Sequence, residues 1–201
     1  ALSPQDPEAH YNLGVTLKGL GRLEEAEASY TQAITFKPDY ADAHNNLGVT
    51  LQELGRLQEA EASYNQSIAL KPDSAEAHSN LGNTLRILGR LEEAEASFTQ
   101  AIALKPDYAG AYSNLGVTLT ELERVEEAIT SYNQALALQP KYPSVKHMLS
   151  ALSGETTATA PQDYVEELFD NYAARFESSL IGNLEYKIPK LITEIIIKYN
   201  K

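Results

Sequence analysis

Cysteine is absent from this chain of 201 residues, so disulfides, cysteine nucleophiles and cysteine-ligated metal sites are excluded. Basic residues are also few. Lys and Arg number 16 against 28 Asp and Glu, and the net charge of −12 argues against nucleic acid or an anionic membrane as a partner. No apolar run approaches the roughly 18 residues of a membrane span. The absence of cysteine is compatible with a reducing compartment, and we expect a cytoplasmic protein.

A 34-residue repeat organises most of the chain. The tripeptide Asn-Leu-Gly returns four times at this spacing, and so do an alanine, an aromatic residue and a proline. The last three columns are Ala26, Ala60, Ala94, Ala128; Tyr30, Tyr64, Phe98, Tyr132; and Pro38, Pro72, Pro106, Pro140. Such self-similarity is typical of a solenoid. It divides the chain into four repeats, at residues 7–40, 41–74, 75–108 and 109–142.

The spacing of apolar residues predicts two helices in each repeat. In the first repeat, Leu13 and Leu17 fall on one helical stripe, and we expect both to face the core of the hairpin. Gly21 supplies the end of this first helix. The second helix stops before Pro38, because proline disfavours helix in the residue that precedes it. Asp39 can then cap the first helix of the next repeat.

This pattern resembles the tetratricopeptide repeat (TPR). The Leu-Gly pair, the alanine, the aromatic residue, the second alanine and the proline all fall where that family has them. The resemblance implies an all-α fold, a right-handed superhelix of helical hairpins with a concave groove lined by the first helices. It also implies a protein-protein interaction module that binds an extended peptide or a partner protein. The fourth repeat departs from the pattern, because Glu123 replaces the turn glycine, and we expect a cost of about 1 kcal/mol there.

An unbroken column of asparagines is the sharpest functional feature of the predicted groove. A carboxamide can pair with both the N–H and the C=O of an extended peptide. The column resembles the asparagine ladder in the repeats of O-linked N-acetylglucosamine transferase. The alternative is a structural ladder, in which the asparagines bond each other or the backbone of neighbouring hairpins. The predicted peptide contacts are Asn12, Asn46, Asn80 and Asn114, with Tyr11, Asn45, Asn83, Lys18 and Arg86 in neighbouring columns.

Two other classes of site are not expected. The carboxylate clamp with which some TPR proteins hold acidic chaperone tails needs basic residues in a column that here begins with Tyr11 and Asn45. His10, His44 and His78 recur once per repeat, but neighbouring helices lie roughly 10 Å apart, and metal ligands must converge to about 2 Å from one ion. We therefore expect no metal, and half-buried histidine rings. The recurring acidic runs are expected to be solvated outer faces.

The repeat stops after residue 142. A capping helix is expected at 143–152, a linker at 153–162 and a C-terminal helical pair within 163–201. The segment 160–192 resembles the lead-in of a class of TPR-linked, class I S-adenosylmethionine-dependent methyltransferases. In that family a Tyr-Ala-x-x-Phe pattern, matched here by Tyr172 and Phe176, helps to cover the cofactor. The glycine-rich cofactor loop is missing, so we expect no cofactor and no enzymatic activity in this chain, and S-adenosylmethionine only in a full-length parent.

Three functions remain open at this stage. The chain can be a peptide-binding interaction module, the substrate-recruiting fragment of a methyltransferase cut before its catalytic core, or a self-assembling scaffold. In the last case the C-terminal helices or the N-terminal edge would form a homo-oligomer. Residues 1–6 look like the tail of a preceding repeat, and the only methionine is Met148. We therefore expect a piece of a longer protein.

Overall fold

The computed structural model describes residues 5–154 and Val165. Within these residues the chain forms nine α-helices and no strand, which confirms the predicted all-α fold. The first eight helices pair into four hairpins, one for each 34-residue repeat. In chain order the helices are α1 (Pro7–Gly19), α2 (Leu23–Phe36), α3 (Ala41–Glu53), α4 (Leu57–Leu70), α5 (Ala75–Ile87), α6 (Leu91–Leu104), α7 (Ala109–Glu121), α8 (Val125–Leu138) and α9 (Pro143–Leu152). None of these helices is long and apolar enough to cross a membrane.

Several predictions about the two ends of the chain lie outside the described residues. They concern residues 1–4, the linker after residue 154, and the C-terminal helical pair with its methyltransferase-like positions Tyr172 and Phe176. The expected capping helix lies inside them. It is α9, which packs on α8 through the buried side chain of Val145.

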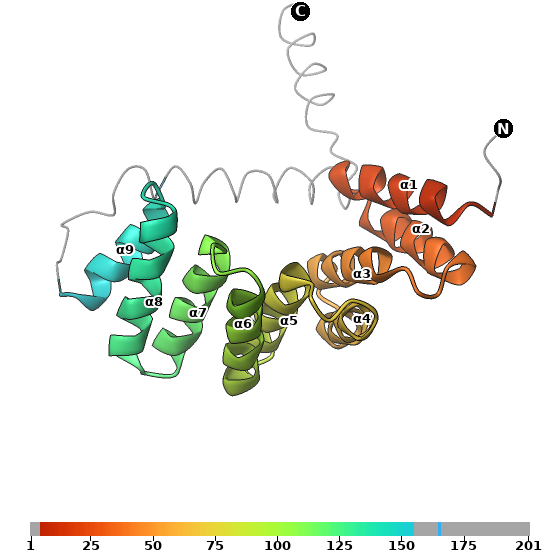
Figure 1. Ribbon diagram of the computed structural model, residues 1–201. Helices are drawn as coiled ribbons and strands as arrows, with labels where there is room; N and C mark the ends of the chain where they lie inside the picture. Colours follow the sequence, from red (N-terminus) through yellow and green to blue (C-terminus); the bar gives the residue numbers. More distant parts are fainter. Residues whose placement is uncertain (1–4, 155–164, 166–201) are drawn as a thin grey trace, which may run out of the picture.

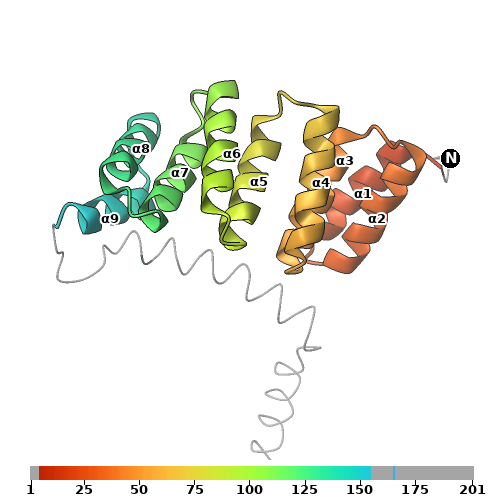
Figure 2. The ribbon, with the colours of Figure 1, turned by 90° about the horizontal axis from the view of Figure 1, so that it is seen from below.

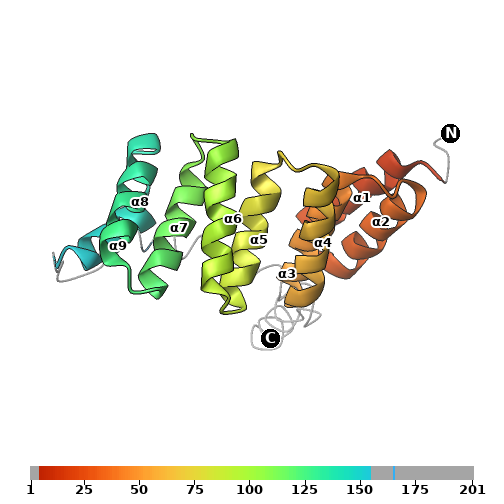
Figure 3. The same ribbon diagram turned by 60° about the horizontal axis from the view of Figure 1, so that its bottom comes forward.

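The four hairpins stack in a row that curves into an arc (Figure 1). Each second helix packs on the first helix of the next repeat, so that α2 contacts α3, α4 contacts α5 and α6 contacts α7. The first helices of successive repeats also touch each other, α1 with α3, α3 with α5 and α5 with α7. The first helices therefore line the concave side of the arc. The second helices form its outer side, and the row runs from α1 to α9 in the other views (Figures 2 and 3).

Each hairpin turns at one residue in the left-handed region of the backbone. This residue is Gly21 (φ 71°), Gly55 (φ 76°) and Gly89 (φ 76°) in the first three repeats and Glu123 (φ 60°) in the fourth. Glycine adopts this conformation without the steric penalty that a Cβ imposes. The fourth turn keeps the geometry of the others with a less suitable residue.

The helix starts differ from the prediction in one respect. Asp39 does not cap α3, whose N-cap residue is Tyr40 and has no side-chain hydrogen bond. The predicted Asp39 cap is therefore wrong. Side-chain caps are present on α1, where Asp6 accepts from the backbone N–H of Glu8 at 3.0 Å, and on α5, where Ser74 plays this role.

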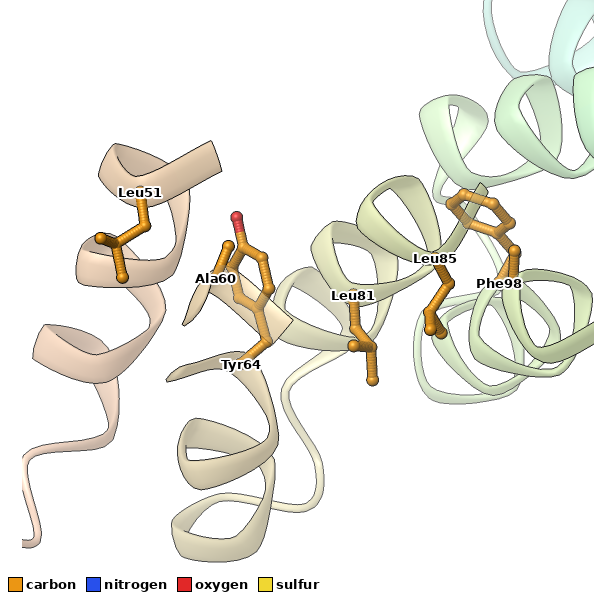
Figure 4. Packing of buried hydrophobic residues seen from close by; sticks show 7 residues of the cluster. Leu51, Ala60, Tyr64, Leu81, Leu85 and Phe98 are labelled. Atoms are coloured by element: carbon orange, nitrogen blue, oxygen red, sulfur yellow. The ribbon is translucent and has the colours of Figure 1, made fainter. Parts of the chain in front are cut away.

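The close approach of two helices in each hairpin depends on a glycine facing an aromatic ring. A Cβ added at Gly14 would lie 2.6 Å from the ring of Tyr30, and one added at Gly82 would lie 2.9 Å from Phe98. Gly48 and Gly116 face Tyr64 and Tyr132 in the same way. All four rings are buried. Figure 4 shows the ring of Tyr64 in the shared core between Leu51 on α3 and Leu81 on α5.

The leucine before Gly48, Gly82 and Gly116 packs on the preceding repeat. Leu81 is 8% exposed and belongs to the core that joins the second and third repeats. Leu47 packs against the cluster around Leu17 and Tyr30 in the first repeat. Leu13 has no earlier hairpin to contact among the described residues and is 49% exposed. The prediction that Leu13 faces the core of its own hairpin is therefore wrong, whereas Leu17 is buried as predicted.

Replacing Glu123 by glycine should raise the free energy of unfolding by about 1 kcal/mol, because glycine reaches the left-handed region without a Cβ clash. Chemical denaturation measures the difference. Gly89→Ala at the equivalent turn is the matched reverse change and should lower the stability by a similar amount. A Glu123→Gly variant no more stable than the wild type would show that the fourth turn carries no strain.

Gly82→Ala should lower the free energy of unfolding by about 1–3 kcal/mol, because the added methyl group overlaps the buried ring of Phe98. Gly19→Ala is the matched control. No atom outside its own helix lies within 4 Å of a Cβ added there, and alanine favours helix over glycine, so its stability should be unchanged or slightly higher. Equal stabilities of the two variants would mean that the ring contact does not limit the approach of α5 and α6.

Candidate functional site

The first helices carry all the residues predicted to contact a peptide. Asn12 lies on α1, Asn46 on α3, Asn80 on α5 and Asn114 on α7, at the same position of each helix. Because these helices line the concave side, the four asparagines form a row across it. Asn12 is exposed and the other three are half-buried.

Two of these asparagines tie one repeat to the next. The Nδ2 of Asn46 donates to the Oη of Tyr11 at 3.0 Å, and the Nδ2 of Asn80 donates to the Oδ1 of Asn45 at 3.1 Å. For Asn114 the equivalent acceptor would be Ser79, but the structure has no hydrogen bond between these two described residues. Each bond uses one amide N–H and leaves the second N–H and the oxygen of the carboxamide for another partner. The row is therefore a structural ladder in part.

The residues beside the ladder differ in how accessible they are. Asn45 is 8% exposed and its oxygen accepts from Asn80, so it offers little surface to a peptide. Tyr11 is half-buried and its ring lies 5.0 Å from that of Tyr40. Asn83 is half-buried, in a column that holds valine in the other three repeats. Of the predicted contacts, Asn45 is the one that is buried.

The two cations predicted for the concave side are already paired. The Nζ of Lys18 lies 3.2 Å from the Oε1 of Glu53, and the Nη1 of Arg86 lies 2.7 Å from the Oε1 of Glu121. Both acids belong to the following repeat. Each cation therefore joins two repeats, and its charge is largely offset before any ligand arrives.

Tyrosine hydroxyls lie beneath the ladder. The Oη of Tyr64 donates to the Oε1 of Gln52 at 3.3 Å, and Thr84 of the next repeat donates to the same oxygen at 2.8 Å. The Oη of Tyr30 is buried and has no hydrogen-bond partner among the described residues. Burial raises the pKa of Tyr30 to about 12 and raises the pKa of Tyr64 further.

An arginine–glutamate network on the outer side was missed by the sequence reasoning, which treated the acidic runs as solvated. The guanidinium of Arg56, the N-cap residue of α4, bonds Glu59 in that helix and reaches Glu27 of the preceding repeat at 2.7 Å. Arg90 repeats this arrangement with Glu61, and Arg124 repeats it with Glu95. The constant separation of 29 residues between each arginine and this glutamate was the signal in the sequence. Exposed pairs of this kind contribute little singly, and their number makes them a network.

The recurring histidines have a structural role. The Nε2 of His44 lies 3.1 Å from the backbone oxygen of Pro38, and His78 makes the equivalent contact with Pro72. The ring of His10 packs at 5.4 Å from that of Phe36. The contacts of His44 and His78 join the residues that follow α2 and α4 to the start of α3 and α5, and the three rings are half-buried as expected.

A hollow of about 320 Å³ lies between α2, α3 and α4, away from the asparagine row. Its lining includes Ile34, His44 and Leu47. A second hollow of similar size lies between α4, α5 and α6. Neither contains a residue predicted to bind a peptide.

The stability of the protein should fall above pH 10 because the buried tyrosines resist ionisation. Burial raises the pKa of Tyr64 in the folded state above its ordinary value of 10.0, so the folded state holds this proton more tightly than the unfolded chain. The protonated Tyr64 therefore makes its full contribution to the free energy of unfolding below pH 10, and this contribution is lost as the pH rises above 10. At pH 11 the loss is about 1.4 kcal/mol for one such tyrosine.

Denaturation of the wild type and Tyr64→Phe between pH 8 and pH 11 measures this effect. Phe98 occupies the same column, so phenylalanine fits the site. The difference in stability between the two proteins should be constant up to pH 9 and should then shift in favour of the variant. Parallel curves up to pH 11 would contradict the raised pKa.

Comparison with known proteins agrees with this architecture. A family model described as tetratricopeptide repeat matches residues 39–107 and 73–141, and a second, described as TPR repeat, matches residues 17–55. No curated protein matches the sequence.

The fold is shared with solved TPR structures. PilF of Pseudomonas aeruginosa has a TM-score of 0.69 at 23% identity, over 88% of this chain and 76% of that one. MamA of Desulfovibrio magneticus RS-1 has a TM-score of 0.69 at 18% identity, over 91% and 99% of the two chains. The first TPR domain of Spaghetti, solved with the HSP90 peptide SRMEEVD, has a TM-score of 0.56 at 25% identity, over 57% and 91%. The family models cover more than half of the residues, and the chain belongs to the tetratricopeptide repeat family.

Proposed function

We propose that this chain is a protein-interaction module that binds an extended peptide segment of a partner protein on the concave side of its arc. The observation that carries the proposal is the row of four asparagines on successive first helices. The inter-repeat bonds of Asn46 and Asn80 use only one N–H of each carboxamide. The remaining N–H and oxygen are the pair that a peptide main chain requires.

The fold supports this proposal by analogy with a structural neighbour. The first TPR domain of Spaghetti was solved with a bound HSP90 peptide, so a related arc accommodates a peptide. That peptide is acidic at its end. Here Lys18 and Arg86 are each neutralised by a glutamate of the next repeat. A peptide of a different charge therefore fits this chain better.

The methyltransferase and scaffold hypotheses have less support. The first depends on residues 160–192, which lie outside the described part of the chain apart from Val165, and it stays a prediction about a parent protein. The second would use the C-terminal helices or the exposed face around Leu13, and nothing in the described residues identifies a second copy there. Neither conflicts with peptide binding.

Asn114→Ala tests the proposal without disturbing the repeat-to-repeat bonds, because Asn114 takes no part in them within the described structure. The probe is a library of random decapeptides with acetylated and amidated ends. The best binder is then measured by fluorescence anisotropy. Loss of two main-chain hydrogen bonds should weaken its binding by about 10-fold or more.

Asn133→Ala is the matched control, because Asn133 is exposed on α8 in the same repeat, on the second helix. The Asn133→Ala variant should bind the decapeptide with the same affinity as the wild type. Equal affinities of Asn114→Ala and Asn133→Ala, or the absence of any binding peptide, would contradict recognition by the asparagine row.

A further inference from the structure

The hydroxyl of Tyr30 differs from its counterparts in the other repeats. It is fully buried, yet its oxygen has no hydrogen-bond partner among the described residues. In the second repeat the equivalent hydroxyl, on Tyr64, donates to Gln52. In the third repeat the ring is Phe98, which has no hydroxyl to satisfy. An unpaired buried hydroxyl is unfavourable, and native structures rarely keep one without a reason.

The residue that occupies the position of Gln52 accounts for this difference. The position of Gln52 in the second repeat is taken by Lys18 in the first and by Arg86 in the third. A lysine ammonium carries donors only, so Lys18 cannot accept the hydrogen of Tyr30. It pairs instead with Glu53. In the third repeat the cation, Arg86, occurs with Phe98, so no hydroxyl is left unpaired. In the first repeat Lys18 occurs with Tyr30, and the hydroxyl has no acceptor.

The unpaired hydroxyl lies toward the concave side. Burial raises its pKa most, Tyr11 and Glu53 raise it further, and the nearby amide of Asn46 lowers it; these three residues belong to α1 and α3. Asn46 acts here as a donor, and a donor does not accept the phenol hydrogen of Tyr30. The Nδ2 of Asn46 donates to Tyr11, where the phenol oxygen is the acceptor, so the hydrogen of Tyr11 is not used in that bond. The rings of Tyr11 and Tyr30 lie 5.9 Å apart. Two neighbouring phenol rings of the first repeat thus carry hydroxyl hydrogens that have no protein acceptor among the described residues.

The charges around this pair favour a neutral acceptor. Burial raises the pKa of Tyr11, and the negative charges of Asp42 and Glu76 raise it further. Asp42 and Glu8 act in the same direction on the neighbouring Tyr40, whose pKa is raised first by burial. A carboxylate brought to this place would be repelled. A main-chain carbonyl has the required lone pairs and no net charge, and nearby lysine or arginine side chains of the same peptide would be attracted.

We propose that Tyr11 and Tyr30 form an anchor point on the concave side, where they donate to one main-chain carbonyl of an extended peptide that is neutral or basic. This inference rests on the proposed function and adds the place and the charge of the bound segment. The oxygen of Tyr30 is covered in the free chain, so the side chains above it shift when the carbonyl arrives. Binding then satisfies a donor that folding leaves unpaired.

Tyr30→Phe tests the anchor in the full chain with the amidated decapeptide library described above. The variant should fold with equal or higher thermal stability, because it loses an unpaired hydroxyl. Its affinity for the best wild-type binder should fall by about 10-fold, the value of one buried hydrogen bond at a ligand. Tyr64→Phe is the matched control and should bind within about 2-fold of the wild type, since its hydroxyl serves Gln52.

The outcomes separate this inference from the proposed function. If Asn114→Ala weakens binding while Tyr30→Phe and Tyr11→Phe bind as the wild type does, the peptide lies on the concave side and the anchor is wrong. If peptides with free carboxylate ends bind more tightly than the amidated ones, or if acidic peptides bind most tightly, the proposed neutral or basic charge of the peptide is wrong. Enrichment of lysine and arginine together with a Tyr30→Phe defect supports the anchor.

Discussion

The contact between a glycine and an aromatic ring is the constraint on which the rest of the structure depends. The ring of Tyr64 occupies the space that a Cβ of Gly48 would fill, and this arrangement recurs in all four hairpins. It fixes the distance between the two helices of a hairpin. Because each second helix then packs on the next first helix, the same distance recurs along the row. The arc curves because successive first helices contact each other, and this contact recurs at the same spacing since the repeats contain no insertions.

Two rows of polar contacts join the hairpins that this packing sets side by side. On the concave side, the amides of Asn46 and Asn80 reach back to the preceding repeat, and Lys18 reaches forward to the next. On the outer side, arginines such as Arg90 connect glutamates of two repeats. The asparagine row thus combines support of the arc with the display of unused donors and acceptors. A residue that binds a ligand and also holds its neighbour is positioned before the ligand arrives.

Sequence periodicity was sufficient to predict the helical hairpins, because a column that recurs every 34 residues reports one packing environment several times; their superhelical arrangement followed from the resemblance to the TPR family. It was less informative about single contacts. Leu13 shares its column with Leu81, but the two differ in exposure because only Leu81 has a preceding hairpin among the described residues. The pairing of Lys18 with Glu53 and the unpaired hydroxyl of Tyr30 depend on side-chain reach across repeats. Whether a side chain contacts a residue of another repeat depends on distances in three dimensions, which the column pattern does not give.

The inner side joins repeats through amide hydrogen bonds and the ion pairs of Lys18 and Arg86, whereas the outer side joins them through ionic bridges such as that of Arg90. Dissolved salt screens the outer bridges far more than the inner hydrogen bonds. Rising ionic strength therefore weakens the outer bridges at every joint, whereas on the inner side it weakens only the pairs of Lys18 and Arg86. Small rotations at the joints add along the row, so a change in ionic strength should alter the curvature of the arc while every helix stays intact.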